Sequence, residues 1–557
     1  MFKKIKRSMT LIVSFVSLLL ILLVFSGCTS RQQDKDTIKL MVIWNGISFI
    51  NPEDQVNNRV AEVIREKTGV TLDVEFCETN ETQKLTQVFS IGTNMPDIIM
   101  CPFWGGTLGE AGVIKDAAQS GLLLAWDDYW DMAPNIKDNF TVGVSKQFVE
   151  KELNAKEFGG KQYVMPIHCP ATKEDTPNWG YTVFGRKDIL EDLNVDPNSI
   201  NTSEQLYELA VKIKNGNYKD VNGNPVIPAG NFQDGWDYSC YVNSYRYRQF
   251  TAIYEAYEGA NLMWMSQTAE LKQEVLFMRK MISQGLYDKE AFTQTTTQAQ
   301  QKHINASYGL TAGHYTNLKN YLSESLYVSH PDKEYIPLGP IYDANGNPYM
   351  SDTYRFQGDS GGASMIITKD CQNIDAVMRY LNYINSDEGR YLTYLGVEGE
   401  DWTWQEDGRP RMTETYFENV KKDSKYGINR GIESIFIFGV SRLPRNNIYY
   451  AKEDEVDEYQ NQLDEWYPFV FAPDDAIPAT SWDEEFYDYD RLVDVLASMN
   501  YSDVVESAFF ASSDSEALAK IDKYNASINK NALMDNYLRF VYEKVAEARK
   551  AGKTVVF

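Results

Sequence analysis

The chain has 557 residues, more than one ordinary hydrophobic core accommodates, so we expect at least two domains. Its hydrophobic content of 43% is typical of a globular protein. The formal net charge of −25 argues against a nucleic-acid-binding protein, because phosphates require a basic surface. Aromatic residues make up 13% of the chain; most are expected in cores, and a few could serve as stacking platforms for sugars.

Residues 1–27 have the pattern of an export signal. Four basic residues fall within the first seven positions, and Leu11–Phe25 is an apolar run. That run is short for a membrane-spanning helix, so we interpret it as a signal peptide. The segment Phe25-Ser26-Gly27-Cys28 resembles a bacterial lipobox, with Phe25 where Leu is usual, in which Cys28 is lipidated and becomes the mature N-terminus. Simple cleavage and secretion is the alternative.

Residues 28–37 are then predicted to be a polar tether. Two or more acyl chains on Cys28 would anchor it stably to the outer face of the cell membrane. Loss of the four basic signal residues would make the mature chain more acidic, which favours solubility and keeps it away from anionic lipid.

Three apolar strands alternate with two helices in the first part of the chain. We predict strands at Ile38–Ile43, Val70–Phe76 and Asp97–Met100, with a helix beginning near Pro52 and a second one at Thr82–Ile91. Loops at the carboxyl ends of such strands face the ligand crevice of an open α/β sheet. Ligand contacts are therefore expected from Trp44 and Asn45, which follow the first strand, and from Trp104, which follows the third. The alternative is that Trp44 and Trp104 pack beneath a neighbouring helix.

Several motifs occur in the order found in one protein family. Pro96-Asp97-Ile98-Ile99 after a helix that ends at Gly92 resembles the first lobe of extracellular solute-binding proteins (family 1), the capture lipoproteins of ABC importers. Tyr181–Leu193 resembles the family's "Tyr-Arg-Lys-Asp-Trp-Leu" motif, with Ile189 in place of Trp, and Ser386–Gly389 resembles its "Ser-Asp-Glu-Gly" junction. The resemblance spans nearly the whole mature chain, and it is specific in order and spacing rather than in any single motif.

The resemblance implies an α/β fold of the type II periplasmic-binding-protein kind, in which two discontinuous lobes are joined by hinge crossovers. It places residues 38–166 and 335–395 in the first lobe and residues 167–334 and 396–557 in the second. Long helices at 453–470 and 532–551 are expected to complete the second lobe.

Further ligand contacts are expected in the hinge and the second lobe. The loop-rich segment 168–179 would cross the crevice, the aromatic-acid loop at 234–238 offers a second wall, and segment 303–315 resembles the family's strand that ends at a crevice ring. A polar, glycine-bordered stretch precedes the return strand 363–368. His314 could equally be structural, and Arg355 could simply pair with Asp359. The candidates are Trp179, Trp236, Tyr238, His314, Tyr315, Arg355, Gln357 and Asp359.

Two loops, Asp220–Pro225 and Asp343–Pro348, place Asx residues at alternate positions, as a calcium loop does. Pro225 stands where a calcium loop needs Gly, and Asn231 stands where it needs a bidentate Glu. We predict hairpin turns built on Asn-Gly and no cofactor, with calcium at the first loop as the alternative. The cysteines beyond Cys28 show neither zinc spacing nor a disulfide framework, so free thiols are favoured and one disulfide stays open: Cys77, Cys101, Cys169, Cys240 and Cys371.

The chain contains no Gly-x-Ser-x-Gly elbow, no His-Glu-x-x-His and no phosphate-binding Gly-Lys-Ser loop, and its four His form no cluster, so we do not expect an enzyme. The resemblance implies a monomeric binder of a carbohydrate, in particular an oligosaccharide, which closes by a hinge and is presented to an ABC permease. The alternatives are a polysaccharide-degrading enzyme, a surface sensor partner or adhesin, and a binding protein for peptides or another solute.

Overall fold

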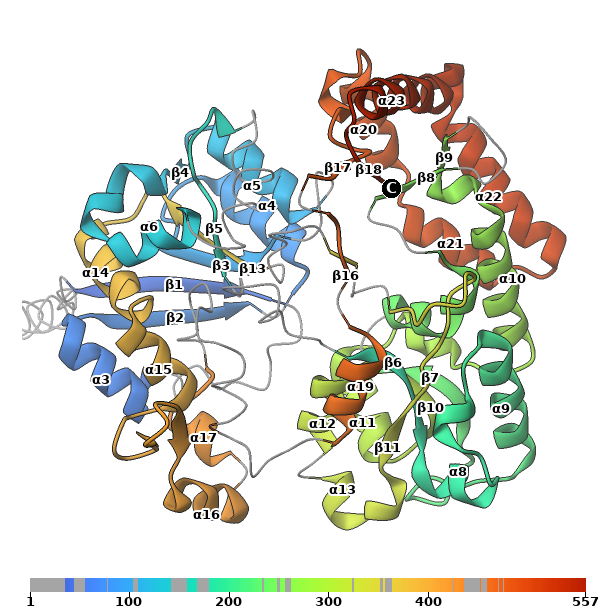
Figure 1. The fold of residues 1–557 in the computed structure, drawn as a ribbon, viewed down its shortest axis with the longest axis horizontal. Helices are drawn as coiled ribbons and strands as arrows, with labels where there is room; N and C mark the ends of the chain where they lie inside the picture. Colours follow the sequence, from blue (N-terminus) through green and yellow to red (C-terminus); the bar gives the residue numbers. More distant parts are fainter. Residues whose placement is uncertain are drawn as a thin grey trace, which may run out of the picture.

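The computed structural model describes residues 36–44, 56–77, 79–103, 109–141, 158–167, 180–232, 235–247, 251–255, 262–322, 325–350, 354–355, 363–423, 425–434, 451, 458–468, 470–473 and 475–557. The predicted signal peptide and Cys28 lie outside these residues, and β1 already begins at Thr37. Two separate sheets with separate cores form the two lobes expected from the sequence (Figure 1).

None of the helices in the described ranges has the length and apolar composition that crossing a membrane requires.

The first lobe contains a six-stranded mixed sheet with the order β2-β1-β3-β13-β4, and β5 also pairs with β13. β1 is parallel to β2 and β3, whereas β13 returns antiparallel to β3. This confirms the predicted βαβαβ unit and the predicted return strand. The strands are β1 (Thr37–Ile43), β2 (Thr71–Cys77), β3 (Ile98–Pro102), β4 (Leu123–Leu124), β5 (Met165–Ile167) and β13 (Ala363–Thr368).

Helices cover both faces of this sheet, which is why β3 is buried along its whole length. The Asn58 side chain caps the first turn of α3, and Gly69 ends the helix in the left-handed conformation. α3 begins at Arg59, and the helix start expected at Pro52 lies outside the described residues. The helices of this lobe include α3 (Arg59–Thr68), α4 (Glu81–Ile91), α5 (Glu110–Gln119), the 3₁₀ helix η2 (Trp126–Met132), α6 (Pro134–Thr141), α14 (Ile374–Ile384) and α15 (Asp387–Leu395).

The second lobe contains a four-stranded sheet with the order β11-β6-β10-β7. β10 is parallel to β7 and antiparallel to β6. The strands are β6 (Tyr181–Arg186), β7 (Ile227–Asn231), β10 (Tyr308–His314) and β11 (Tyr335–Leu338). The helices include α8 (Lys187–Asp192), α9 (Ser203–Asn215), the 3₁₀ helices η7 (Gly235–Tyr245) and η9 (Lys289–Phe292), α10 (Ala269–Ser283), α11 (Thr296–Ile304), α12 (Tyr315–Leu322), α13 (Leu326–Ser329) and α19 (Glu458–Trp466).

Two of the expected lobe boundaries are wrong. Residues 335–338 were expected in the first lobe, but they form β11, which pairs with β6, and Met350 still belongs to a core cluster of the second lobe. Residues 396–434 were expected in the second lobe, but Trp402, Met412 and Ile432 are buried in the first core. This segment contains β14 (Trp402–Trp404), β15 (Pro410–Met412), α16 (Glu414–Lys422) and α17 (Tyr426–Asn429).

The C-terminal part has a hydrophobic core of its own beside the second lobe, at the top right of Figure 1. α21 and α22 pack against α10, which joins this C-terminal module to the second lobe. The predicted long helix at 532–551 is confirmed, whereas the helix predicted at 453–470 ends at Trp466 in α19, and residues 452–457 lie outside the described ones. The module contains β8 (Ile253–Glu255), β9 (Leu262–Trp264), β17 (Ile477–Pro478), α20 (Tyr489–Ser498), α21 (Tyr501–Phe509), α22 (Asp514–Ile528), α23 (Leu533–Lys550) and β18 (Val555–Val556).

The chain passes between the lobes at three places in the described residues. β5 of the first lobe is followed by β6 of the second, and β11 is followed by β13 of the first. Ala451 is buried in the first core, whereas Leu463 of the next helix, α19, is buried in the second lobe. Beside the return crossing, β12 (Tyr354–Arg355) pairs in parallel with β16 (Val470–Phe471).

Candidate functional site

One edge of the second sheet carries two of the predicted site residues of that lobe, His314 and Tyr315. β7 and β10 end at this edge and β6 begins there, and in the register His314 lies opposite Tyr181. The connection from β5 of the first lobe leads to this same edge, because it enters the second lobe at β6. The arrangement is the one expected for a ligand crevice at the carboxyl ends of parallel strands.

His314 is 6% exposed at this edge, and its ring meets the Tyr181 ring edge-on at 5.1 Å between centroids. Burial lowers the pKa of His314 to about 4, so its imidazole is neutral at physiological pH. A neutral imidazole offers one hydrogen-bond donor and one acceptor. Tyr315, the next residue, stacks on Phe184 with centroids 5.8 Å apart and belongs to a buried cluster of this lobe.

Two glycines allow the segments at this edge to approach closely. Gly180 has φ +68°, and a Cβ there would lie 2.9 Å from Leu463 Cδ1 and 3.0 Å from Tyr315 Cβ. At Gly313 a Cβ would lie 2.8 Å from Phe232 Cβ. Because Leu463 belongs to α19, this helix packs directly against the edge that carries His314.

The aromatic-acid loop at 234–238 brings Asp237, rather than the predicted Tyr238, to the site edge. The Tyr238 ring packs against Phe292 and Phe509, at 6.1 Å and 4.9 Å between centroids, and burial raises its pKa. Asp237 instead lies at the site edge, 1% exposed, with Oδ2 3.3 Å from the position of a Cβ on Gly313. Its position between two aromatic residues is the only signal in the sequence that could have singled out Asp237.

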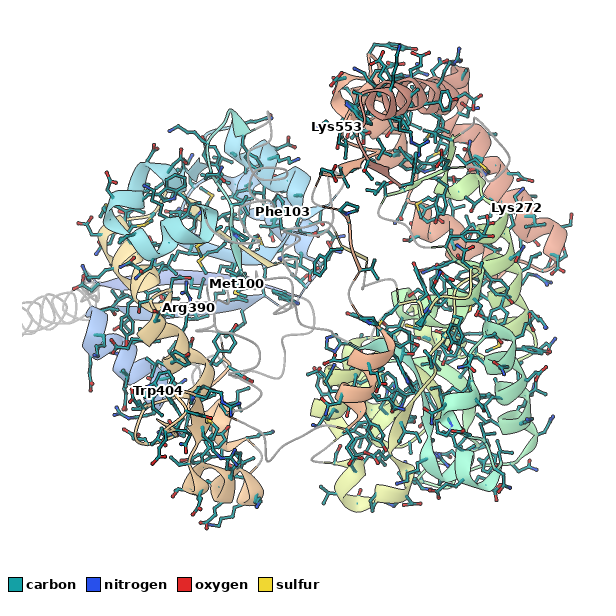
Figure 2. The ribbon with its side chains drawn as sticks, in the orientation of Figure 1. Met100, Phe103, Lys272, Arg390, Trp404 and Lys553 are labelled. Atoms are coloured by element: carbon teal, nitrogen blue, oxygen red, sulfur yellow. The ribbon has the colours of Figure 1, made fainter. Side chains whose placement is uncertain are left out.

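In the first lobe the carboxyl ends of β1, β2 and β3 point toward the second lobe (Figure 1). Trp44 follows β1, is half-buried against the first core, and its backbone N–H donates to the Cys77 carbonyl at 3.2 Å. Phe103 follows β3 and is also half-buried against this core. Figure 2 shows Met100 and Phe103 near the end of β3 that faces the second lobe. We did not predict Phe103, although it directly precedes the predicted Trp104.

The structure brings Tyr181, Asp237, His314 and Tyr315 together in the second lobe, and it places Trp44 and Phe103 at the facing edge of the first. Arg355 lies in β12 next to β16, and Trp236 lies at the start of η7. The remaining candidates lie outside the described residues: Asn45, Trp104, Trp179, Gln357 and Asp359.

Both Asx-rich loops are hairpin turns, as predicted. The Asp220 carboxylate accepts the backbone N–H groups of Asn222 and Asn224, and Lys219 pairs with Pro225 across the turn. Asp343 binds the backbone of its own turn in the same way. No group of three or more potential metal ligands occurs among the described side chains. The expectation that the protein has no cofactor stays a prediction.

The four cysteines that the structure describes are free thiols. Cys101 and Cys240 are buried as predicted, whereas Cys77 and Cys371 are half-buried. Burial raises the pKa of Cys101 to about 12, which keeps this thiol protonated and unreactive. Cys169 lies outside the described residues.

Comparison with known proteins is consistent with this geometry. The model of a family described as bacterial extracellular solute-binding protein matches residues 58–391, which is more than half of the chain. No curated protein matches the sequence significantly.

Solved structures match over nearly their whole length. The alginate-binding protein AlgQ2 without calcium ion is 17% identical, covers 93% of this chain and 99% of its own, and has a TM-score of 0.63. FusA of Streptococcus pneumoniae in complex with kestose is 17% identical, with coverage of 93% and 100% and a TM-score of 0.60. NgtS of Streptococcus pneumoniae in complex with Man5GlcNAc is 15% identical, with coverage of 91% and 99% and a TM-score of 0.53. At these identities the likeness establishes the two-lobe fold.

Proposed function

The chain belongs to the family of bacterial extracellular solute-binding proteins, and from this premise we propose that it captures an oligosaccharide between its two lobes for an ABC importer. The observation that carries the proposal is the pair of facing edges. Rings and buried polar groups gather where the strands of each lobe end, with Tyr181 and His314 on one side and Trp44 and Phe103 on the other. Two of the similar solved structures are complexes with kestose and with Man5GlcNAc.

The chemistry of the edge suits a polyhydroxylated ligand. Aromatic rings stack on the C–H faces of sugars, and buried polar groups bind their hydroxyls. His314, which is neutral, and the buried Asp237 are the polar groups that border this edge, beside the rings of Tyr181 and Tyr315. The hydroxyl–imidazole pair of Thr311 and His303, 2.7 Å apart, is fully buried, so a substrate does not reach it, and we propose the edge as a site of binding rather than hydrolysis.

The remaining parts of the proposal concern location and partners. Cys28 would carry the lipid, and the polar tether would hold the monomeric protein at the outer face of the cell membrane. Closure of the lobes around a sugar would create the surface that the transmembrane permease subunits bind. The N-terminal signal in the sequence supports the lipid anchor, and family membership supports the permease.

A thermal-shift screen of the processed chain against a glycan panel tests this function. We expect at least one oligosaccharide to raise the melting temperature, because a ligand at one hundred times its Kd stabilises the folded state by about 2.7 kcal/mol. His314→Ala should reduce the shift, whereas Asp387→Ala, a matched variant at an exposed acid at the start of α15, should not. The proposal fails if the sugars are turned over into products, or if only peptides stabilise the protein.

A further inference from the structure

A second hollow lies on the first lobe, outside the space between the lobes. Its volume is about 620 Å³, and one face of α14 forms its longest wall. Asp375, Arg379 and Asn382 recur at helical spacing along that face, with the buried Met378 between them. The other walls come from the end of α3 and from the junction of η2 with α6. In Figure 1 these elements lie on the side of the first lobe away from the second.

The charges around this α14 groove do not favour an anion. Arg379 already pairs with Asp36 at 2.8 Å and donates to the Thr68 carbonyl at 2.7 Å, and Lys67 pairs with Glu388 at 2.7 Å. Each cation is therefore matched by an acid, and the exposed Asp375 adds one more negative charge. A phosphate or an acidic sugar would meet net repulsion, so the groove suits a neutral ligand.

The polar groups of the α14 groove are oriented in advance. The Asn135 backbone N–H donates to Asn382 Oδ1, and Asn135 Nδ2 donates to the Asn382 carbonyl, both at 2.9 Å. This interlock leaves Asn382 Nδ2 as a donor and Asn135 Oδ1 as an acceptor, neither with another partner among the described residues. Met132, which is 45% exposed, provides an apolar surface beside these amides, and the buried Met378 forms the floor beneath it.

We propose that the α14 groove is a second carbohydrate-contact site, which binds a neutral saccharide through the Asn135–Asn382 amides and the two methionines. This proposal rests on the proposed function in one respect, the choice of a saccharide as the ligand. The volume is within the range of roughly 300–1,000 Å³ that small-molecule sites occupy. Because every lining residue belongs to the first lobe, binding here requires no closure of the lobes.

Methionine-methyl NMR tests the proposal on the processed chain. The methyl group of Met132 reports directly on the α14 groove, and that of the buried Met378 reports on its floor. The methyl group of Met100, which is buried in the first core within β3, reports on changes in the sheet beneath the facing edge. Met→Leu variants assign the three signals. Nystose and Man5GlcNAc are the neutral probes, and an alginate tetramer is the charged probe. We expect the neutral sugars to shift Met132 and Met378 saturably and alginate to leave both unchanged.

Two variants connect the shifts to the groove. Asn382→Ala should weaken the saturation of the Met132 and Met378 shifts about tenfold, the effect of losing one well-placed hydrogen bond. Asp375→Ala, on the same face but outside the Asn135 interlock, should weaken it less and guards against a folding defect in the first variant. The control Glu208→Ala replaces an exposed acid on α9 of the second lobe and should change nothing.

The outcomes separate this proposal from the proposed function. If neutral sugars shift Met100 while Met132 and Met378 stay unchanged, the α14 groove is not a sugar site and the function between the lobes stands. If Met132 and Met378 stay unchanged with both neutral sugars, this proposal fails, and the thermal-shift screen decides the proposed function separately. If Met132 and Met378 respond to alginate alone, the ligand is not a neutral saccharide. If the shifts are the same in Asn382→Ala and Asp375→Ala as in the parent protein, the sugar does not bind in the α14 groove.

Discussion

At the scale of single residues, burial sets the protonation of several groups that titrate near neutral pH. His303 donates from Nδ1 to the Ala299 carbonyl and accepts at Nε2 from the Thr311 hydroxyl, each at 2.7 Å, and burial lowers its pKa to about 4. In the C-terminal module the Tyr537 hydroxyl donates to Asp483 at 2.6 Å. Burial raises the pKa of Asp483 to about 7 despite that hydrogen bond.

His303 and Asp483 give the stability of the folded protein opposite dependences on pH. Below pH 6.5 the unfolded chain binds a proton at His303 that the folded chain does not bind until about pH 4, so stability falls with acid. Asp483 stays protonated in the folded state up to about pH 7, whereas the unfolded carboxyl ionises near pH 4. Its contribution therefore falls as the pH rises from about 4 to 7, by up to about 1.4 kcal/mol per pH unit.

Asp483→Asn removes this titration while keeping an oxygen that can accept from Tyr537. We expect the variant to lose the decline in stability between pH 4 and 7 and to be more stable than the parent at pH 8. Urea unfolding of the C-terminal module at a series of pH values measures the effect. Asp488→Asn, a half-exposed acid of the same module, is the matched control. An unchanged pH slope in Asp483→Asn would contradict the buried, protonated carboxyl.

At the scale of elements, α19 and the edge of the second sheet are assembled around Gly180. Leu463 of α19 and Tyr315 of α12 both occupy the space that a side chain at this position would need. The Tyr315 backbone N–H also donates to the Gly180 carbonyl at 3.3 Å. α19, the helix that follows the third crossing, is therefore packed directly against the proposed ligand site, so a change at Gly180 disturbs both the helix and the site.

Gly180→Ala should destabilise the protein by about 1–2 kcal/mol through its positive φ. Overpacking against Leu463 and Tyr315 should add about 1–3 kcal/mol. Gly223→Ala is the control, because Gly223 also has positive φ but would meet no atom within 4 Å. Denaturant unfolding compares the two, and titration with the sugar found in the glycan screen should show weaker binding for Gly180→Ala alone. Equal effects of the two substitutions would mean that the close approach is unimportant.

At the scale of the whole molecule, two lobes with separate cores are joined by three crossing segments. The return crossing is additionally paired with β16, which leads into the C-terminal module. Because the module packs on α10 of the second lobe, we expect the two to move as one body against the first lobe.

Saturation with the oligosaccharide found in the screen should therefore decrease the radius of gyration in small-angle X-ray scattering. The decrease reflects closure of the lobes around the ligand. A panel sugar that produces no thermal shift is the control and should leave the scattering curve unchanged. A radius of gyration that stays constant at saturating ligand would contradict hinge closure while leaving binding itself untouched.

Local patterns in the sequence determined the strands and helices of the first lobe, the return strand 363–368 and both Asn-Gly turns. Apolar runs, caps and turn residues act over a few positions, so they are legible without knowledge of distant contacts. The order of family motifs also predicted the two-lobe fold. Among the described site residues, this reasoning correctly brought His314 and Tyr315 to the edge where β10 ends.

Only the tertiary structure decided which core each apolar face joins. Trp402 and Met412 lie in the first core and Tyr335 in the second, although their sequence context favoured the opposite lobes. Tyr238 packs against Phe292 and Phe509, while neighbouring Asp237 lies at the site edge. Hydrophobic burial is non-directional, so a pattern specifies that a face is buried but not against which partner. That choice depends on long-range packing, which a local pattern does not encode.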